Sequence, residues 1–348
     1  MIPTSPQTSA VKKVSMVISY CLLLIVALVV FIVLFFNLQR HQRETEEASL
    51  TAPKSGHFVK AADLNIFVQE AGPAEGEPVV LIHGTGSWSE IWRDTITPLA
   101  KAGFHVVALD LPPFGYSDMP SGAEQFTRTL QAARIAGMLE SLNIQKATLV
   151  AHSVSSRVAL ETALRYPDRF KKIVLVDPAL GFPKITDTEK EPDMVPNDPG
   201  IIIKTIFGHK PLLNAVISTY GTNPLSIKKL FSSFVFDKTA ITDVRIKVLQ
   251  QPMKVRGTTE AYGDWLENLL VTRDTDSESI HSSNLKKLKM PIDIIWGSED
   301  TVTPLWQGKD LQQLILGSNL HIIKGVGHMP YLENVTEFNS VLLQILNK

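Results

Sequence analysis

Ser153, in the stretch LVAHSVSS, is the first residue in this chain that suggests chemistry. It follows a short apolar run, residues 147–152, and precedes Val-Ser-Ser, which is typical of a strand that turns abruptly into a helix. A nucleophile at such a turn needs small residues two positions before and after it, because the backbone is strained and bulky side chains would collide there. Ala151 and Ser155 meet this demand, though less permissively than the glycines usual at these positions. Ser153 is thus predicted to be a nucleophile, with an ordinary helix N-cap as the alternative.

A serine hydroxyl attacks a carbonyl only when a base takes its proton, and the base needs an acid that fixes its tautomer. Asp300 follows the apolar run IDIIWG and His328 follows LHIIKG, so both stand at the carboxyl ends of predicted strands, where open sheets place their sites. Either residue alone is a weak signal. Together, in the order Ser, Asp, His, they predict a catalytic triad. Glu299 and Asp177 are the other candidates for the acid.

The elements that must position these residues alternate along the chain. Short apolar runs, separated by helical stretches such as residues 127–143 and 155–170, predict a doubly wound, mostly parallel α/β sheet. Residues 57–72 predict a hairpin. The runs that predict buried strands are PVVLIHG, HVVALDLP, ATLVAHS, KIVLVDP, IDIIWG and LHIIKG.

One interval breaks the alternation. Residues 181–288 contain helical patterns but no convincing strand, which predicts a helical cap inserted between two parts of the core, residues 56–180 and 289–348. Asp177 precedes this interval and is expected to anchor its start. The charged stretch 186–200 is expected to be an exposed loop or disordered. The helices are expected at residues 201–207, 211–218, 226–234, 241–250 and 260–270.

The N-terminal part of the chain predicts a membrane anchor. After a tail of residues 1–13, residues 14–36 carry no charge, and a helix of this length spans a bilayer core of roughly 30 Å. A cleaved signal peptide would have a shorter apolar region followed by a small-x-small site, which is missing here. We expect a single-pass anchor, a solvated linker at residues 37–55, and a domain on the extracytoplasmic side, although the flanking positive charges are almost balanced.

The composition narrows the possible partners. The formal net charge is -1 and no long basic run occurs, so nucleic acid is not an expected partner. Cys21 is the only cysteine, which excludes an internal disulfide and a cysteine metal site. No metal or cofactor motif is visible, and none is expected. Lys286, Lys287 and Lys289 are expected to form a solvated face rather than a lipid contact.

From about residue 56 to 348 the chain resembles the capped branch of the α/β-hydrolase superfamily. The resemblance rests, in order, on LIHGTG, DLPPFGYSD, AHSVS, WGSEDTVTP and GVGHMPYLENVTEF. It implies an oxyanion hole formed by the backbone N–H groups of Thr85 and Val154, with Gly84 and Gly86 allowing close approach to the substrate. It further implies that Trp88 and His152 contact the substrate, although Trp88 and Trp92 are equally expected to pack in the core. The loop residues Asp110, Gly115 and Ser117 are expected to shape the site.

Relatives that carry an aspartate at the elbow cleave epoxides or carbon–halogen bonds, so a serine there favours attack on a carbonyl. We therefore expect a membrane-anchored serine hydrolase that cleaves a carboxylic ester, possibly lipid-like, through an acyl-enzyme. Two alternatives stay open. One is a carbon–carbon bond hydrolase of diketone-like acids, and the other is a non-catalytic binding protein that keeps the fold.

Overall fold

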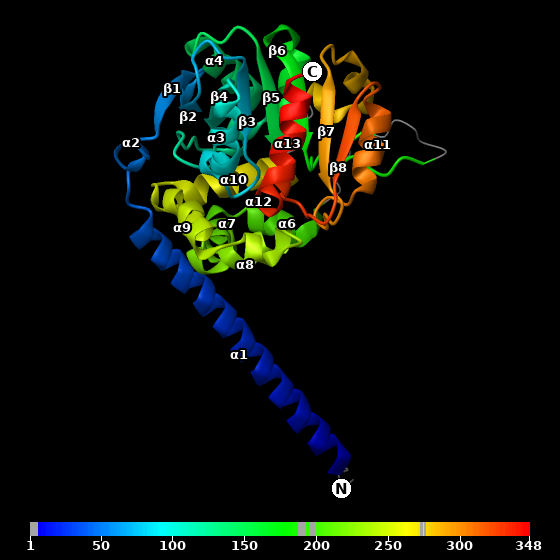
Figure 1. The fold of residues 1–348 in the computed structure, drawn as a ribbon. Helices are drawn as coiled ribbons and strands as arrows, with labels where there is room; N and C mark the ends of the chain where they lie inside the picture. The colour runs from blue at the N-terminus through cyan, green and yellow to red at the C-terminus, as the bar shows by residue number, and fades with distance from the viewer. Residues whose placement is uncertain (1–5, 187–192, 195–198, 272–273, 275) are drawn as a thin grey trace.

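An eight-stranded sheet forms the centre of the protein (Figure 1). The computed structural model describes residues 6–186, 193–194, 199–271, 274 and 276–348, with side chains described from residue 13 onward. The strand order is β1-β2-β4-β3-β5-β6-β7-β8; β2 is antiparallel to β1 and β4, and all other neighbours are parallel. The predicted doubly wound sheet is confirmed. The strands are β1 Gly56–Ala61, β2 Leu64–Ala71, β3 Pro78–Ile82, β4 His105–Leu109, β5 Ala147–His152, β6 Phe170–Val176, β7 Ile292–Gly297 and β8 Asn319–Ile323.

Helices cover both faces of the sheet, which explains why the central strands are almost continuously apolar. α4 (Arg128–Ser141), α5 (Ser155–Arg165) and α11 (Trp306–Leu314) pack on one face. α3 (Arg93–Lys101) and α13 (Val335–Leu346) pack on the other. All six residues of β5 are buried, so the strand that leads into Ser153 lies in the middle of the core.

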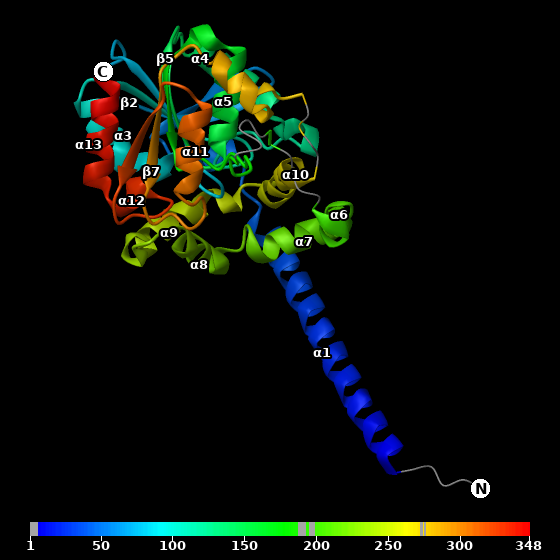
Figure 2. The same cartoon turned by 90° about the vertical axis from the view of Figure 1, so that its right-hand side faces the viewer.

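The cap is the helical insertion between β6 and β7, and it lies across the carboxyl edge of the parallel strands (Figures 1 and 2). Asn223 and Thr242 each accept a hydrogen bond from the first turn of a cap helix, which fixes where those two helices begin. Most of the charged stretch 186–200 lies outside the described residues. The cap helices are α6 Gly200–Phe207, α7 Lys210–Tyr220, α8 Pro224–Phe234, α9 Asp243–Gln250 and α10 Thr258–Leu270.

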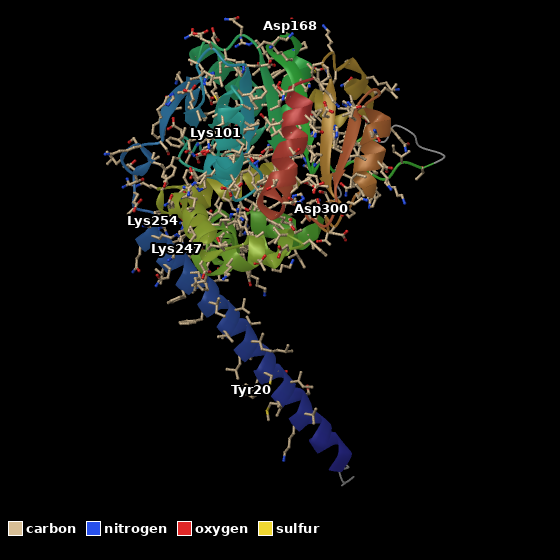
Figure 3. The ribbon with its side chains drawn as sticks, viewed as in Figure 1. Tyr20, Lys101, Asp168, Lys247, Lys254 and Asp300 are labelled. Atoms are coloured by element: carbon tan, nitrogen blue, oxygen red, sulfur yellow. The ribbon has the colours of Figure 1, made fainter. Side chains whose placement is uncertain are left out.

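The N-terminal helix is longer than the sequence predicted. α1 runs from Pro6 to Arg43, and its segment Lys13–Arg43 is long and apolar enough to cross a membrane, with a mean hydropathy of 3.2 in its most apolar window. It leaves the domain from the cap side, and Tyr20 lies far out along it (Figures 1, 2 and 3). Residues 37–43, expected to be linker, are the last turns of this helix, which packs on α7.

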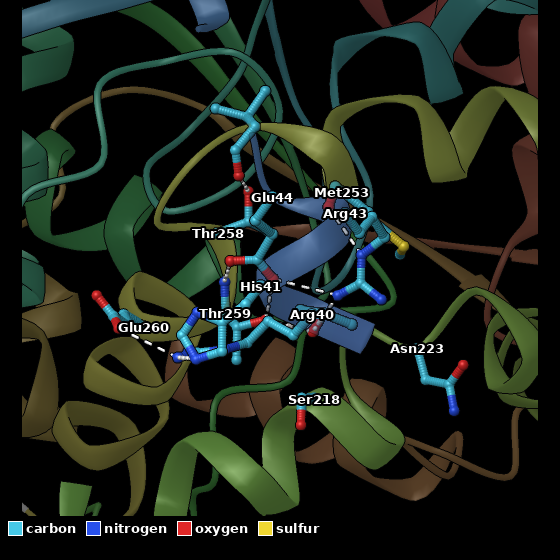
Figure 4. Close-up of polar contacts among 12 residues, drawn as sticks. Arg40, His41, Arg43, Glu44, Ser218, Asn223, Met253, Thr258, Thr259 and Glu260 are labelled. Carbon is cyan, nitrogen blue, oxygen red and sulfur yellow. Dashed lines mark hydrogen bonds and ion pairs between the residues drawn. The ribbon is translucent and has the colours of Figure 1, made fainter. Parts of the chain in front are cut away.

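The segment that follows is also held against the cap (Figure 4). We call the contacts of Arg40, Arg43 and Glu44 with the cap the junction. α10 begins after Gly257, which has no side chain to cap it, and Glu44 supplies the missing acceptor. Its carboxylate accepts hydrogen bonds from the backbone N–H of Thr259, at 3.2 Å, and from the Thr259 hydroxyl. Arg43 donates to the carbonyl of Met253 at 3.1 Å, and Arg40 lies 3.4 Å from Glu260. The expectation of a solvated tether is therefore wrong for residues 37–47, which continue with the short helix α2, Ala48–Thr51.

Candidate active site

Ser153 occupies the sharp turn between β5 and α5. Its φ is +56°, a left-handed conformation that a non-glycine residue adopts only when the surroundings impose it. Those surroundings are the neighbouring strand and the loop after it. The Ser153 N–H donates to the carbonyl of Val176 at 2.9 Å, and the Ser153 carbonyl accepts from the N–H of Ala179 at 3.1 Å. This turn holds the Ser153 hydroxyl at the carboxyl edge of the sheet, under the cap.

Ser153, His328 and Asp300 form a continuous hydrogen-bonded chain. His328 Nε2 lies 2.9 Å from Ser153 Oγ, and His328 Nδ1 lies 2.7 Å from Asp300 Oδ2. The three side chains come from the ends of β5, β8 and β7, and all three residues are buried. Because the carboxylate fixes the Nδ1–H tautomer, Nε2 is free to accept the serine proton. The arrangement has the geometry needed for nucleophilic attack on a carbonyl.

Asp300 is held by more groups than the sequence indicated. Its Oδ1 accepts the N–H groups of Val302 (2.7 Å) and Thr303 (2.9 Å), and its Oδ2 also accepts the Thr303 hydroxyl (2.6 Å). Burial acts to raise the pKa of Asp300, but the hydrogen bonds from His328 and Thr303 outweigh burial and lower the pKa below its ordinary value. Asp300 therefore stays ionised. It lies where the sheet meets the cap (Figure 3).

The two other acid candidates are placed differently. Glu299 is exposed and accepts a hydrogen bond from Ser298. Asp177 is buried, and its Oδ1 accepts the N–H of Gly297 at 2.8 Å. Burial, and then the charge of Asp300, raise the pKa of Asp177 well above its ordinary value, which favours the neutral form of Asp177 beside Asp300. Asp177, Asp300 and His328 place ligand atoms within 4.8 Å of one another, but both nitrogens of His328 are already engaged within the chain of hydrogen bonds.

The expected oxyanion donors flank Ser153. A Cβ on Gly84 would lie 2.5 Å from Nδ1 of His152 and 3.1 Å from Cβ of Ser153, so only glycine lets this loop pack against the turn. Gly86 is in the left-handed region, with a φ of +70°. Among the described residues, no acceptor lies within hydrogen-bond distance of the backbone N–H of Thr85 or Val154. Both N–H groups are thus available to an incoming oxygen.

Ser155 explains why a serine can replace the usual glycine of the motif. Its hydroxyl donates to the carbonyl of His83 at 2.6 Å, which ties the start of α5 to the loop that carries Thr85. His83 is itself buried, and burial lowers its pKa to about 4. Its neutral ring accepts the N–H of Leu111 at 3.0 Å and donates to the carbonyl of Gly84 at 2.8 Å. The loop that carries Thr85 is therefore held in place by the side chains of His83 and Ser155.

The loop after β4 is organised around Asp110, as expected. Its carboxylate accepts the N–H groups of Ser89 (2.6 Å) and Tyr116 (2.8 Å), and its carbonyl accepts the Ser117 hydroxyl (2.6 Å). Burial raises the pKa of Asp110 to about 7, against these hydrogen bonds. A Cβ on Gly115 would lie 2.0 Å from Asp110 Oδ2, so this glycine makes room for the carboxylate.

Two residues expected to contact the substrate lie elsewhere. Trp88 is buried against Tyr116, and its indole N–H donates to the carbonyl of Val248 in the cap. Trp88 therefore packs between the core and the cap. His152 is buried behind His328 and donates from Nε2 to the His328 carbonyl at 2.8 Å, while its Nδ1 lies 3.2 Å from the Tyr331 hydroxyl. Trp92 packs on Tyr331, with ring centroids 4.3 Å apart. None of these residues lines the large cavity described below.

The cap touches the histidine of the site directly. The His328 N–H donates to the carbonyl of Phe234 at 3.0 Å, and the two rings meet edge to face. Glu333 holds both sides of this contact, because its carboxylate accepts the N–H groups of Phe236 and Asp237 from the cap and of Gly327 from the histidine loop. Glu333 lies within the motif GVGHMPYLENVTEF, but its role could not be predicted, because its partners are backbone groups, two of them on a distant segment.

A cavity of about 610 Å³ opens beside the turn, between the core and the cap. Its core side includes Val154 and Ser155, the two residues after Ser153, and its cap side includes Trp265 and Leu269 from α10. Most of the lining is apolar, as in sites that bind small molecules. Ser153 itself is not among the lining residues, but the two residues that follow it are, so the cavity lies next to the turn.

The fold, the turn and the triad geometry define an α/β hydrolase. Residues 77–335 match the model of the alpha/beta hydrolase fold family, and the chain belongs to this family. It is 31% identical over 315 residues to a 2-hydroxy-6-oxo-6-phenylhexa-2,4-dienoate hydrolase of Comamonas testosteroni, covering 86% of this chain and 99% of that protein. It is 26% identical to a 2-hydroxymuconate semialdehyde hydrolase of Pseudomonas sp. (strain CF600), covering 85% of this chain and 95% of that protein.

Solved structures show the same fold. A meta-cleavage product hydrolase from Pseudomonas fluorescens IP01 superposes with a TM-score of 0.64 at 26% identity, over 84% of this chain and 97% of that chain. A membrane phospholipase A, described as a bacterial virulence factor, superposes with a TM-score of 0.64 at 21% identity, over 97% of this chain and 98% of that chain. Since residues 1–55 precede β1, the second match includes much of α1.

Proposed function

We propose that the protein is a membrane-anchored serine hydrolase that cleaves carboxylic esters, with Ser153 as nucleophile, His328 as general base and acid, and Asp300 as its orienting acid. The observation that carries the proposal is the buried chain of hydrogen bonds from Ser153 through His328 to Asp300, beside an apolar cavity. A binding protein would have no need of a strained serine hydrogen-bonded to a tautomer-fixed imidazole.

The geometry supports a two-step reaction. Ser153 Oγ attacks the ester carbonyl while His328 Nε2 takes its proton, and the N–H groups of Thr85 and Val154 stabilise the oxyanion. His328 then gives the proton to the departing alkoxide, which leaves an acyl-enzyme. Water attacks this acyl group by the same route in reverse, and His328 returns the proton to Ser153.

A lipid-like ester is favoured because the cap and α1 lie on the same side of the domain (Figures 1 and 2). A bilayer crossed by α1 would lie next to α6, α7 and α8, which carry large exposed apolar side chains. Lys247 and Lys254 lie on the cap near the end of α1, where they would meet anionic headgroups (Figure 3). The exposed apolar residues are Ile201, Ile202, Leu212, Tyr220 and Leu225.

The anchor has its own test. We expect the full chain to sediment with membranes and to resist carbonate extraction, with the domain on the extracytoplasmic side accessible to added protease. A mature protein that begins near residue 50 would instead show that the N-terminal segment is a cleaved signal.

Hydrolysis of a carbon–carbon bond in a diketone-like acid is the second candidate. It is favoured by the named activity of the relative that is 31% identical to this chain. The same nucleophile, base and oxyanion donors would serve, because in both reactions the attacked group is a carbonyl. The two candidates differ in the leaving group, which is an alkoxide in one and a stabilised carbanion in the other.

One experiment separates the candidates. The full chain in detergent is given aryl esters of increasing acyl length and, separately, 2-hydroxy-6-oxo-6-phenylhexa-2,4-dienoate, and the release of aryl alcohol or the loss of dienoate absorbance is followed. We expect turnover of esters, labelling of Ser153 by a fluorophosphonate, and loss of both in Ser153→Ala. Faster turnover of the dienoate would establish the second candidate. A folded protein that turns over neither substrate and takes up no label would be a binding protein.

A further inference from the structure

Two arginines line the otherwise apolar cavity next to Ser153. Arg157 lies on the first turn of α5 and Arg128 on the first turn of α4. Burying a guanidinium costs free energy unless an anion or a set of acceptors compensates it. Arg128 donates to the Ser279 hydroxyl at 3.2 Å and is attracted by the charges of Asp274 and Glu161, whereas Arg157 receives less compensation from the described residues.

Arg157 has one hydrogen bond, from Nε to the carbonyl of Ala179 at 2.7 Å. Among the described residues, no carboxylate lies within 4 Å of either cavity arginine. Three other arginines of the domain, Arg134, Arg165 and Arg245, each pair with a carboxylate at 2.6 to 2.7 Å. Within the part of the chain that the structure describes, the terminal nitrogens of Arg157 donate to no acceptor.

Asp193 and Asp274, the acidic residues among the described residues that line the cavity, have other hydrogen-bond partners. Asp193 accepts hydrogen bonds from His281 and from the N–H of Ser282. Asp274 accepts the backbone N–H of Arg128 at 2.6 Å and attracts its guanidinium from beyond ion-pair distance. Burial, and then the charge of Arg128, lower the pKa of Arg157 to about 9, so Arg157 is still charged at pH 7, and no carboxylate of the described residues pairs with it.

Gly181 makes room for this guanidinium. It has a φ of +82°, and a Cβ there would lie 3.0 Å from Nη2 of Arg157. Arg157 is one helical turn beyond Ser153, about 6 Å along the helix axis. We propose that Arg157, assisted by Arg128, binds an anionic oxygen group of the substrate, a carboxylate or a phosphate, a few bonds away from the carbonyl that Ser153 attacks. This proposal rests on the proposed function and names the class of substrate: an acyl compound that carries an anion near the scissile bond.

The test compares two esters that differ in one charge. The full chain in detergent hydrolyses the mono-4-nitrophenyl ester of glutaric acid and the methyl 4-nitrophenyl diester of the same acid, and the discrimination is the ratio of their kcat/KM values. We expect Arg157→Gln to lower this discrimination about tenfold to a hundredfold, chiefly through the KM of the monoester, because a charge-assisted hydrogen bond is lost. Arg157→Lys is expected to keep part of it. Arg165→Gln, further along α5, is the matched control and should leave the discrimination unchanged.

Binding is measured separately, so that the proposed anion site at Arg157 and the proposed ester hydrolysis are tested independently of each other. Calorimetric titration with glutarate and with butyl phosphate gives the affinity for a carboxylate and for a phosphate, and the tighter ligand names the natural group. We expect Arg157→Gln to weaken the tighter one at least about tenfold. If neither ester is hydrolysed but this binding difference holds, the subsite stands and the proposed reaction does not. Equal binding by wild type and Arg157→Gln, or an equal loss of both ester activities with a lowered melting temperature, would show that Arg157 only supports the fold.

Discussion

Glu44 offers the sharpest test of how the N-terminal helix is joined to the domain. Its side chain is only 7% exposed. Its carboxylate accepts two hydrogen bonds from Thr259 at the N-terminus of α10, and it also forms an ion pair with Arg43 at 3.1 Å. Glu47, three residues later, pairs with Arg256 at 3.2 Å, but its side chain is 54% exposed. We predict that Glu44→Ala destabilises the protein strongly and that Glu47→Ala does not.

The size of the effect follows from the contacts that are lost. Loss of a helix cap costs about 1 kcal/mol, and loss of a hydrogen bond to a charged acceptor costs about 1.5 to 3 kcal/mol. The lower end applies here, because the Thr259 hydroxyl keeps its hydrogen bond with the Thr222 hydroxyl at 2.6 Å. Arg43 adds little, because it keeps its bond to the carbonyl of Met253. The free energy of unfolding should therefore fall by about 3 kcal/mol. The exposed pair of Glu47 is worth at most about 0.5 kcal/mol.

Thermal unfolding of the full chain in detergent measures this difference. For a domain of this size, about 3 kcal/mol corresponds to a fall in Tm of roughly 6 °C, against about 1 °C for the control. Limited proteolysis at the cap should rise in parallel, because the start of α10 loses its acceptor. Equal melting temperatures for the two variants would mean that the junction does not hold in solution and that residues 37–47 are a flexible tether after all.

Three further predictions concern the site. Asp300→Asn should lower kcat by roughly 10⁴-fold because it disturbs the tautomer of the histidine, whereas Asp177→Asn should stay near wild type because an amide mimics a neutral carboxyl; the reverse result would reassign the acid. Thr303→Val removes one of four hydrogen bonds to Asp300 and should lower kcat about tenfold to a hundredfold without a matching fall in Tm; an unchanged kcat would remove Thr303 from the site. The folded-state pKa of Asp110, about 7, lies above its ordinary value, so its contribution to stability is full below about pH 4 and is lost as the pH rises through 7. Melting temperatures should accordingly fall between pH 5 and pH 8, and Asp110→Asn should show less of this fall; a flat wild-type profile would contradict the burial argument.

The strands and cap helices could be predicted because each depends on a local pattern. A continuous apolar run between turn residues predicts a strand buried on both faces, and β3 to β7 are largely buried as predicted. The run LHIIKG also forms a strand, but the prediction that it is buried is wrong, because β8 lies at the edge of the sheet and only Ile323 is buried. The grouping of Ser153, Asp300 and His328 could also be predicted, since parallel strands bring their carboxyl ends to one edge. That argument gives proximity but not side-chain direction, so it could not decide between packing and substrate contact for Trp88, which packs against the cap, or place the ring of His152, which lies behind His328.

Contacts between a side chain and a distant backbone leave no pattern in the sequence. Glu44 and Thr259 are 215 positions apart, and nothing near Glu44 distinguishes it from the other charged residues of its segment. The same holds for Glu333, whose carboxylate serves backbone groups of two loops. A polar stretch after an apolar helix has the composition of a linker whether or not it packs on the rest of the protein. Composition alone therefore could not predict that residues 37–47 contact the cap.

These distant contacts connect parts of the molecule that the sequence shows separately. The cap is held at one end by the junction with α1, through Glu44, and at the other by Glu333 and Phe234, which contact the loop of His328. A displacement of the cap relative to α1 would therefore strain the hydrogen bond between the His328 N–H and the Phe234 carbonyl. It follows that the position of the base depends on how the cap sits against α1. Glu333→Gln should test this link, because its amide can serve the backbone N–H groups of only one of the two loops: kcat should fall while labelling of Ser153 persists at a lower rate, and an unchanged kcat would show that the cap and the base are independent.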